Sequence, residues 1–277
     1  MPRVAVILSS GRTGTQFLAR YFDANYPEVV ARHEPSPSRL IRVLSNAAAS
    51  GAMDRAKLRP WLTRLRGRRL ATLPPETALY LESNGLLYGF AEVLPELWPE
   101  VSIVHVVRDP REQIRSALAH GNDRGLKRLA GALVPWWHPN PRGISGLEPA
   151  TPESGLIGRY AVSWRVINQT IENARSVCPR LLRLRFEELV DPEASGVRRL
   201  CEHLGLPFQT QGRIAPDQRF NVSKRASVGD WRSWSAAECR AVDASCRELM
   251  QEYGYGDEPE WRAKLEQRAE TGSPSIR

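Results

Sequence analysis

Val4-Ala-Val-Ile-Leu-Ser-Ser-Gly-Arg-Thr-Gly-Thr-Gln-Phe-Leu18, near the start of the chain, is the stretch that decides the fold. Residues 4–8 are a run of apolar residues typical of a buried β-strand, and the small residues at 9–14 predict a turn. A helix is expected to begin at Thr15. Such a turn places several backbone N–H groups at the positive end of a helix, which makes a binding site for phosphate or sulfate.

The residues of this turn supply groups that suit an anion. Glycines let the backbone approach closely, Arg12 adds a fixed positive charge, and the hydroxyls of Thr13 and Thr15 add donors. The candidate ligand residues are Gly11, Arg12, Thr13, Gly14, Thr15 and Gln16. The turn does not follow the Gly-x4-Gly-Lys-Ser/Thr pattern of nucleotide triphosphate loops, because it contains no lysine. An ordinary strand-to-helix connection without a ligand remains the alternative at this point.

The length and composition set limits on the class of protein. The chain has 277 residues, of which 42% are apolar and 25% charged, and this is enough for one α/β domain or two small ones. No apolar run approaches the length of a membrane span, and the short strand after Arg3 does not have the form of a secretory signal. We therefore expect a cytoplasmic protein with no membrane span.

The cysteines give no sign of a metal site or a disulfide framework. The four are Cys178, Cys201, Cys239 and Cys246, and none of them forms a Cys-x-x-Cys pair. Cys239 and Cys246 are seven residues apart, so we expect them on one face of a helix in the core. We predict no metal site.

The net charge favours acidic partners. The formal charge is +8, and much of the excess arginine lies between Arg55 and Arg69. Nucleotides, nucleic acid and anionic sugars all fit such a charge. The guanidinium group binds two oxygens of phosphate or sulfate at once. For the 55–69 cluster itself, a solvated basic helix face is favoured over a binding surface.

Four later segments read as strands that alternate with helices, which predicts an α/β fold with a parallel sheet. They are residues 28–35, 78–84, 101–107 and 181–186. Ligands of such sheets bind at the rim where the strands end. His33 and Glu34 stand at the end of the first of these strands, and Arg108 directly follows the third, before a helix with Asp109 as its N-cap.

Two regions differ from this regular pattern. Residues 121–158 are rich in Gly, Pro and Trp, and we interpret them as a lid over the acceptor site. Residues 219–234 are expected to form a basic loop. We predict one domain over residues 1–256 and a loose tail over residues 257–277.

Four places together resemble the sulfotransferases that use 3′-phosphoadenosine 5′-phosphosulfate (PAPS). Ser10-Gly-Arg-Thr-Gly-Thr-Gln-Phe17 is similar to the 5′-phosphosulfate loop of that family, and Val107-Arg-Asp-Pro-Arg-Glu-Gln-Ile-Arg-Ser116 to its 3′-phosphate motif. Leu184-Arg-Phe-Glu-Glu-Leu189 resembles the strand that ends beside the adenine. Lys224-Arg-Ala-Ser-Val-Gly-Asp-Trp231 resembles the late basic loop, and the order and spacing agree from residue 4 to about residue 254.

The resemblance implies a fold, a donor and a set of binding residues. The fold would be a three-layer α/β/α arrangement around a central parallel sheet, of the bacterial P-loop-like sulfotransferase type. PAPS would be the sulfuryl donor and adenosine 3′,5′-bisphosphate (PAP) the product. Besides the first loop, the implied donor-binding residues are Arg108, Ser116, Phe186, Lys224 and Arg225. A donor with negative charge at both ends needs two anion sites on one rim.

The sequence departs from the family pattern in ways that bear on catalysis. Arg12 stands where many members have lysine, Ala226 replaces a common glycine, and Phe186 lacks the hydroxyl of the frequent tyrosine. Asn84 stands where members acting on phenols and steroids have a catalytic histidine, and an amide cannot act as a base.

The general base must therefore be another residue. Other branches of the family, acting on sugars or on protein tyrosines, use a glutamate. We predict Glu34 as the base, with His33 beside it and Glu82 behind it, and Arg12 as the catalytic cation. The alternative is that His33 and Glu34 only end a strand.

Two other functions remain open at this stage. One is a P-loop kinase-like enzyme, and the other is a non-catalytic member that binds nucleic acid or an anionic polysaccharide through residues 55–69. We favour the sulfotransferase, with a nucleotide donor and no nucleic-acid partner. Its acceptor is a hydroxyl or amine of a small molecule, sugar, lipid or peptide, a choice that the sequence leaves open together with the oligomeric state.

Overall fold

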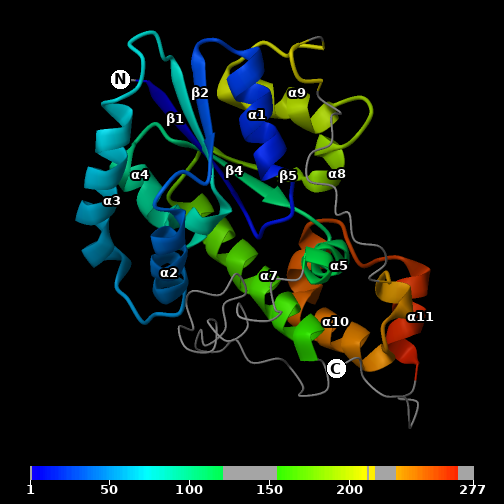
Figure 1. Cartoon of the computed structure of the whole chain (residues 1–277). Coiled ribbons are helices and arrows are strands. Elements are labelled where there is room, and N and C mark those ends of the chain that lie inside the picture. Colours follow the sequence, from blue (N-terminus) through cyan, green and yellow to red (C-terminus); the bar gives the residue numbers. More distant parts are fainter. Residues whose placement is uncertain (1, 121–154, 211, 216–228, 268–277) are drawn as a thin grey trace.

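A computed structural model describes residues 2–120, 155–210, 212–215 and 229–267. Its centre is a five-stranded sheet with the order β2-β3-β1-β4-β5, in which all the pairings are parallel (Figure 1). The strands are β1 (Arg3–Ser9), β2 (Val29–His33), β3 (Leu79–Ser83), β4 (Ser102–Val107) and β5 (Leu181–Arg185). The expected parallel sheet is confirmed, and every strand ends at the same rim.

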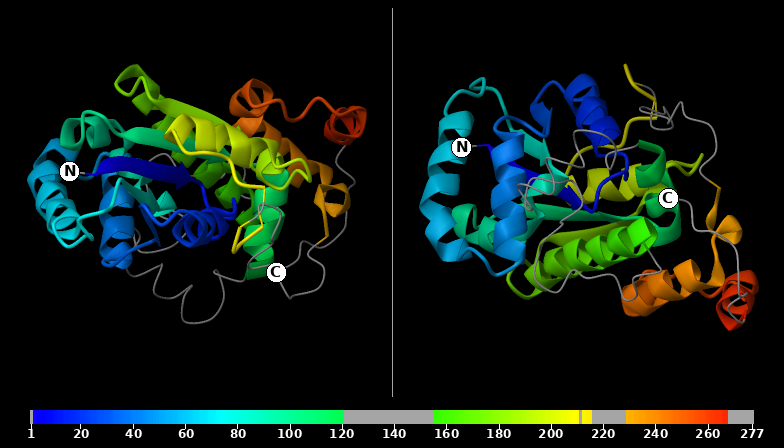
Figure 2. Two further views of the ribbon diagram at one scale, coloured as in Figure 1. Left: turned by 90° about the horizontal axis from the view of Figure 1, so that it is seen from above. Right: turned by 60° about the horizontal axis from the view of Figure 1, so that its bottom comes forward.

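Helices cover both faces of the sheet, as Figures 1 and 2 show. On one face lie α1 (Thr15–Asn25), α8 (Phe186–Leu189) and α9 (Ser195–Leu204). On the other lie α2 (Ser38–Ala49), α3 (Arg55–Leu70), the 3-10 segment η1 (Gly85–Val93), α4 (Leu94–Leu97) and α7 (Gly155–Asn173), which η4 (Ala174–Ser176) follows. Alternate residues of β1 enter the two cores, Ala5 and Ile7 on one side and Val6 and Leu8 on the other. The three-layer prediction is confirmed.

A third apolar cluster lies beside the sheet and is rich in tryptophan. It joins α5 (Pro110–His120) and α7 to η5 (Trp231–Ser233), α10 (Ala236–Glu252) and α11 (Pro259–Glu266). Cys239 and Cys246 are both buried in it, which confirms the expectation that one face of α10 places them in the core. The prediction that Asp109 is the N-cap of α5 is also confirmed. Its Oδ1 accepts a hydrogen bond from the N–H of Arg111 at 2.8 Å.

The expectation of a loose tail from residue 257 is wrong for residues 257–266. Helix α11 occupies this stretch, and Trp261 on it is only 1% exposed. Its charged residues suggested full solvation, but Glu258 pairs with the buried Arg111 at 2.6 Å. Trp261 and Leu265 pack on the third apolar cluster, and these contacts together with the Glu258 ion pair dock a helix that is otherwise polar.

The segment predicted to be a lid, residues 121–158, lies mostly outside the described residues. Residues 121–154 are not described, and residues 155–158 form the first turn of α7. Within the described part of the chain, no helix has the length and apolar character that a membrane crossing requires.

Candidate active site

The anion-binding loop, residues 10–14 between β1 and α1, has the backbone of a tight turn. Gly11, Arg12 and Gly14 have φ values of 89°, 59° and 74°, in the left-handed region. A Cβ added at Gly11 would meet nothing within 4 Å, so open space lies above the turn. No side chain caps the N-terminus of α1, and its first turn carries no acidic residue. The helix therefore presents its positive end to this space.

The two predicted anion sites adjoin each other. Arg12 Nε donates a hydrogen bond to Ser116 Oγ at 3.1 Å, and Arg108 Nη1 donates to the Arg12 carbonyl oxygen at 2.9 Å. Ser116 lies on α5, and Arg108 directly precedes that helix at the end of β4. The loop and the 3′-phosphate motif therefore open at one rim of the sheet.

Phe186 completes this part of the rim. The guanidinium carbon of Arg108 lies 4.4 Å from the centroid of the Phe186 ring. On the loop side, a Cβ at Gly14 would stand 3.4 Å from Phe186 Cε2, an ordinary contact distance, so the loop packs beside the ring. Phe186 follows β5 directly, and thus β1, β4 and β5 each contribute to one constellation.

The electrostatics of the constellation suit an anion. Burial lowers the pKa of Arg12 and of Arg108, and the charge of Arg12 lowers the pKa of Arg108 further. Glu112 and Glu187 oppose this shift at Arg108. Thr13 Oγ1 and Arg108 Nε are buried and have no hydrogen-bond partner among the described residues. These donors and cations fit the phosphate and sulfate groups of a nucleotide.

Two polar residues that the sequence reasoning missed hold the start of the loop. Gln113 Nε2 donates to the Ser10 carbonyl oxygen at 2.7 Å, and Ser10 Oγ donates to Gln113 Oε1 at 2.9 Å. Asn168 Nδ2 donates to Ser10 Oγ at 3.3 Å. The sequence offers two features that could have identified these residues. Gln113 lies one helical turn before Ser116, and Asn168 is a polar residue on the apolar face of α7.

The predicted base lies at the end of β2, next to the same loop. The Ser83 carbonyl oxygen accepts a hydrogen bond from the Glu34 N–H at 3.1 Å and lies 3.1 Å from His33 Nδ1. Ser83 Oγ donates to the Thr15 carbonyl oxygen at 2.7 Å, so one residue links the β2 end to the start of α1. Glu34 has a φ of 41°, a left-handed conformation that is unusual for a residue with a Cβ.

Glu82 has a different environment from Glu34. It is 1% exposed and accepts hydrogen bonds from Arg66 at 2.5 Å, Asn84 at 2.8 Å and Tyr80 at 3.2 Å. A carboxylate with three donors and no solvent contact is a structural group, and this favours Glu34 over Glu82 as the base. Asn84 in turn caps η1, accepting from the Leu86 N–H at 3.1 Å.

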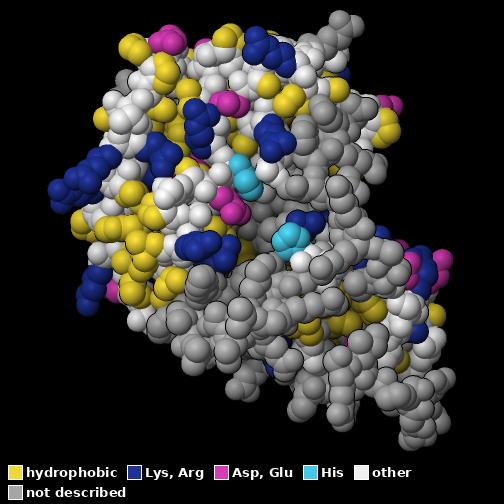
Figure 3. All heavy atoms as spheres, in the orientation of Figure 1, with side chains coloured by type: hydrophobic (Ala, Val, Ile, Leu, Met, Phe, Trp, Pro, Cys, Tyr) yellow, Lys and Arg dark blue, Asp and Glu magenta, His cyan; other side chains and the backbone are white. Residues whose placement is uncertain are grey.

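Near Glu34 the structure places a further cation. Burial lowers the pKa of Arg42 on α2, while the charge of Glu34 opposes this shift and Arg39 adds to it. Figure 3 shows basic side chains, acidic side chains and histidines gathered around a hollow in the centre of one face. The rim at the end of β2 therefore combines a carboxylate with arginine.

Several arginines of the 55–69 cluster have acidic partners within the chain. Arg55 pairs with Glu92, Arg59 with Glu96 at 2.8 Å, and Arg66 with Glu82. The first two pairs attach α3 to η1 and α4, and the third attaches it to β3. Lys224, Arg225 and residues 135–139 lie outside the described residues.

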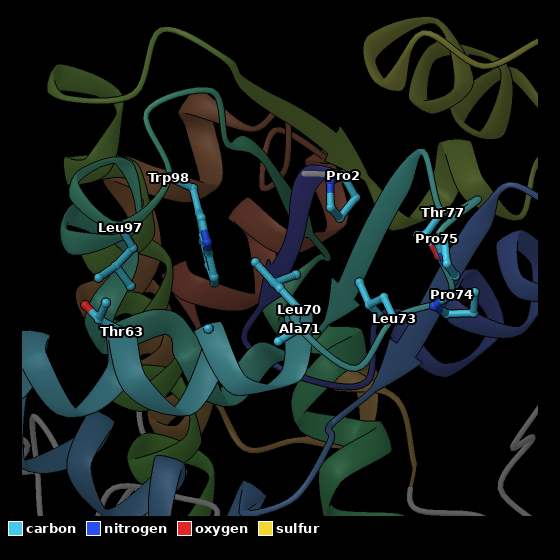
Figure 4. Close-up of a pocket in the computed structure, with 11 residues that line it drawn as sticks. Pro2, Thr63, Leu70, Ala71, Leu73, Pro74, Pro75, Thr77, Leu97 and Trp98 are labelled. Carbon is cyan, nitrogen blue, oxygen red and sulfur yellow. The ribbon is translucent and has the colours of Figure 1, made fainter.

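A pocket of about 560 Å³ lies at the amino ends of the strands, opposite the rim described above (Figure 4). Pro2 precedes β1, Thr77 precedes β3, and Trp98 precedes β4, so these residues mark the amino ends of the strands. The other lining residues are Thr63, Gly67, Leu70, Ala71, Leu73, Pro74, Pro75 and Leu97. None is charged, so this pocket does not suit a nucleotide.

The fold and the rim together define a class: a parallel α/β protein whose two predicted anion sites adjoin each other at the carboxyl ends of its strands. Residues 5–210 match the sulfotransferase family model. The chain belongs to the sulfotransferase family.

Two solved structures of low sequence identity are similar to this chain. The sulfotransferase from Alicyclobacillus acidocaldarius has 16% identity and a TM-score of 0.50, with 95% of this chain and 99% of that chain covered. The sulfotransferase domain from the curacin biosynthetic pathway has 16% identity and a TM-score of 0.48, with 96% of each chain covered. No significant match was found among curated proteins.

Proposed function

We propose that the protein transfers a sulfuryl group from PAPS to a hydroxyl or amine of an acceptor. The observation that carries this proposal is the 3.1 Å hydrogen bond between Arg12 Nε and Ser116 Oγ, because it joins two anion sites at one rim. A ligand with negative charge at both ends requires that arrangement. A P-loop kinase needs only the first site, together with magnesium and a lysine that this loop lacks.

Each part of the rim has a role in this proposal. The loop N–H groups and Arg12 hold the 5′-phosphosulfate and stabilise the charge that develops on the leaving phosphate and the transferred oxygens. Arg108 and Ser116 hold the 3′-phosphate, and Phe186 lies beside the adenine. Lys224 and Arg225 are proposed to add charge at the 3′-phosphate. PAPS supplies the sulfuryl group when bound.

Glu34 is the proposed general base, with His33 next to it. Sulfuryl transfer is an in-line displacement, and by analogy with phosphoryl transfer most of the rate comes from positioning and charge stabilisation. The base takes the proton of the attacking hydroxyl or amine. Its support is the Ser83 link, which connects the Glu34 backbone to the start of α1 and so to the loop that holds the donor.

Calorimetry with PAP tests the proposal without knowledge of the acceptor. The parent is expected to bind, and Arg108→Ala to bind at least tenfold more weakly, which corresponds to about 1.4 kcal/mol. Arg262→Ala serves as the control, because Arg262 is exposed on α11 and pairs with Asp257. Magnesium-dependent binding of ATP without affinity for PAP would instead support a kinase-like enzyme.

A further inference from the structure

A buried chain of hydrogen bonds leads from the anion-binding loop into the protein. It begins at Ser10, whose Oγ accepts from Asn168 Nδ2 at 3.3 Å. Asn168 Oδ1 lies 2.8 Å from His105 Nε2, and His105 Nδ1 lies 2.8 Å from Glu172 Oε1. Glu172 also accepts from Arg183 Nε at 2.9 Å. The chain therefore crosses from the loop, through α7 and β4, to β5.

His105 occupies a position where packing alone would select an aliphatic residue. On the same face of β4 lie Ile103 and Val107, and all three side chains are 0% exposed. A buried polar side chain costs free energy unless it is hydrogen-bonded, and both ring nitrogens of His105 have a partner. The role of His105 at this position is therefore to form these two hydrogen bonds.

Asn168 and Glu172 both present an oxygen to the His105 ring, whose donor and acceptor roles depend on its tautomer. Asn168 Nδ2 also donates to the Trp164 carbonyl oxygen at 2.8 Å, which sets the amide so that its oxygen faces His105. Burial raises the pKa of Glu172, but hydrogen bonds from His105 and Arg183 outweigh it and keep the pKa below its ordinary value. The carboxylate is thus an acceptor for His105, and the amide N–H is left pointing at Ser10.

We propose that Asn168 and His105 are positioning residues that fix Ser10, and with it the start of the anion-binding loop. The inference rests on the proposed function. Among the described residues, side chains that hydrogen-bond the loop come from α5 (Gln113 and Ser116), from Arg108 at the end of β4, and from Asn168 on α7. Arg108 and Ser116 are proposed phosphate ligands, whereas the side-chain hydrogen bonds described for Asn168 go to Ser10, Trp164 and His105. Its contribution is therefore the placement of the loop.

Calorimetry with PAP and urea unfolding, applied to matched variants, separate positioning from stability. Asn168→Leu is expected to weaken PAP binding about fivefold, the effect of one lost hydrogen bond. It also leaves the His105 ring nitrogen without an acceptor, so its stability falls. The double variant His105→Leu/Asn168→Leu replaces both polar groups and is expected to regain stability while PAP binding stays weak. Gln169→Leu, at the adjacent exposed position, changes neither.

Ser10→Ala breaks the same link from the loop side and leaves Asn168 bonded to Trp164 and His105. It is expected to weaken PAP binding at least as much as Asn168→Leu, and it keeps the inference testable if the leucine variants do not fold. PAP affinity that recovers together with stability in the double variant would show a purely structural role and overturn the inference. Unchanged affinity in Ser10→Ala would do the same. A parent that does not bind PAP would remove the proposed function, and this inference with it.

Discussion

At the scale of single residues, the two glutamates at the strand ends differ in what surrounds them. Glu82 is fully buried with three donors, whereas Glu34 is half-buried in a left-handed backbone conformation beside the start of α1. A general base must reach the acceptor, so it has to remain accessible. This contrast makes Glu34 the residue whose replacement best tests the chemistry.

Glu34→Gln is expected to lower turnover at least about 100-fold, the usual contribution of a general base, because the amide cannot take a proton. PAP affinity should stay within about twofold of the parent, since the hydrogen bond described for Glu34 goes to Ser83 and not to residues 10–14, the proposed donor-binding loop. Turnover is measured as PAP release from PAPS with an acceptor found by screening. Glu76→Gln, at an exposed position before β3, is the control. Retained turnover in Glu34→Gln would remove it from the mechanism.

Sequence reasoning located the residues that act through local patterns and missed those that act through long-range contacts. The loop and the motif around Arg108 follow directly from strand, turn and cap signals. Ser10 and Asn168 are separated by 158 residues, and no periodicity predicts their hydrogen bond. Sequence reasoning likewise treated Arg66 as part of the basic cluster 55–69 and missed its pairing with Glu82. That pairing depends on how α3 packs against β3.

At the scale of elements, tertiary contacts explain where the predicted helices differ from those observed. The apolar residues of 86–97 have the spacing of one helix, but the segment forms η1 and then α4. A Cβ at Gly89 would lie 2.4 Å from the Ser45 carbonyl oxygen, and the Gly89 N–H donates to Ser45 Oγ at 2.6 Å. The close approach of α2 fixes this segment, and the approach involves a residue 44 positions away.

The connection of α7 to β4 and β5 through Glu172 predicts a dependence of stability on pH. Although burial raises the Glu172 pKa, the His105 and Arg183 hydrogen bonds outweigh it, so the folded pKa lies below the ordinary value. The stabilisation is therefore present above the unfolded pKa of about 4.3 and is lost as the pH falls through the folded pKa. Glu172→Gln should be less stable at pH 7, and the difference from the parent should shrink below about pH 4.

Urea unfolding at a series of pH values checks this expectation. Glu248→Gln on α10 provides a comparison, because its exposed carboxylate is outside this network. A constant difference between Glu172→Gln and the parent from pH 7 to the acid limit would contradict the account, since the side chain would then act through packing alone.

At the scale of the whole molecule, α11 ties the C-terminal helices to the start of α5. Arg111, in the first turn of α5, pairs with Asp109 and Glu258, both at 2.6 Å. Its guanidinium carbon lies 5.2 Å from the Trp231 ring centroid and 5.0 Å from that of Trp261. Since α5 carries Gln113 and Ser116, the tryptophan cluster supports the helix that holds the anion-binding loop.

Trp261→Ala tests whether α11 is part of the folded domain. Trp261 is 1% exposed and packs edge-to-face on Trp231 with ring centroids 5.3 Å apart, so the truncation should lower the free energy of unfolding by about 3–5 kcal/mol. Arg262→Ala, exposed on the same helix, should cost less than about 0.5 kcal/mol. The Asp109 cap and the packing of α5 on α7 remain in the variant, so the molecules that stay folded should still bind PAP. Parent-like unfolding of Trp261→Ala in urea would mean that residues 257–266 behave in solution as the loose tail that their charged sequence suggests.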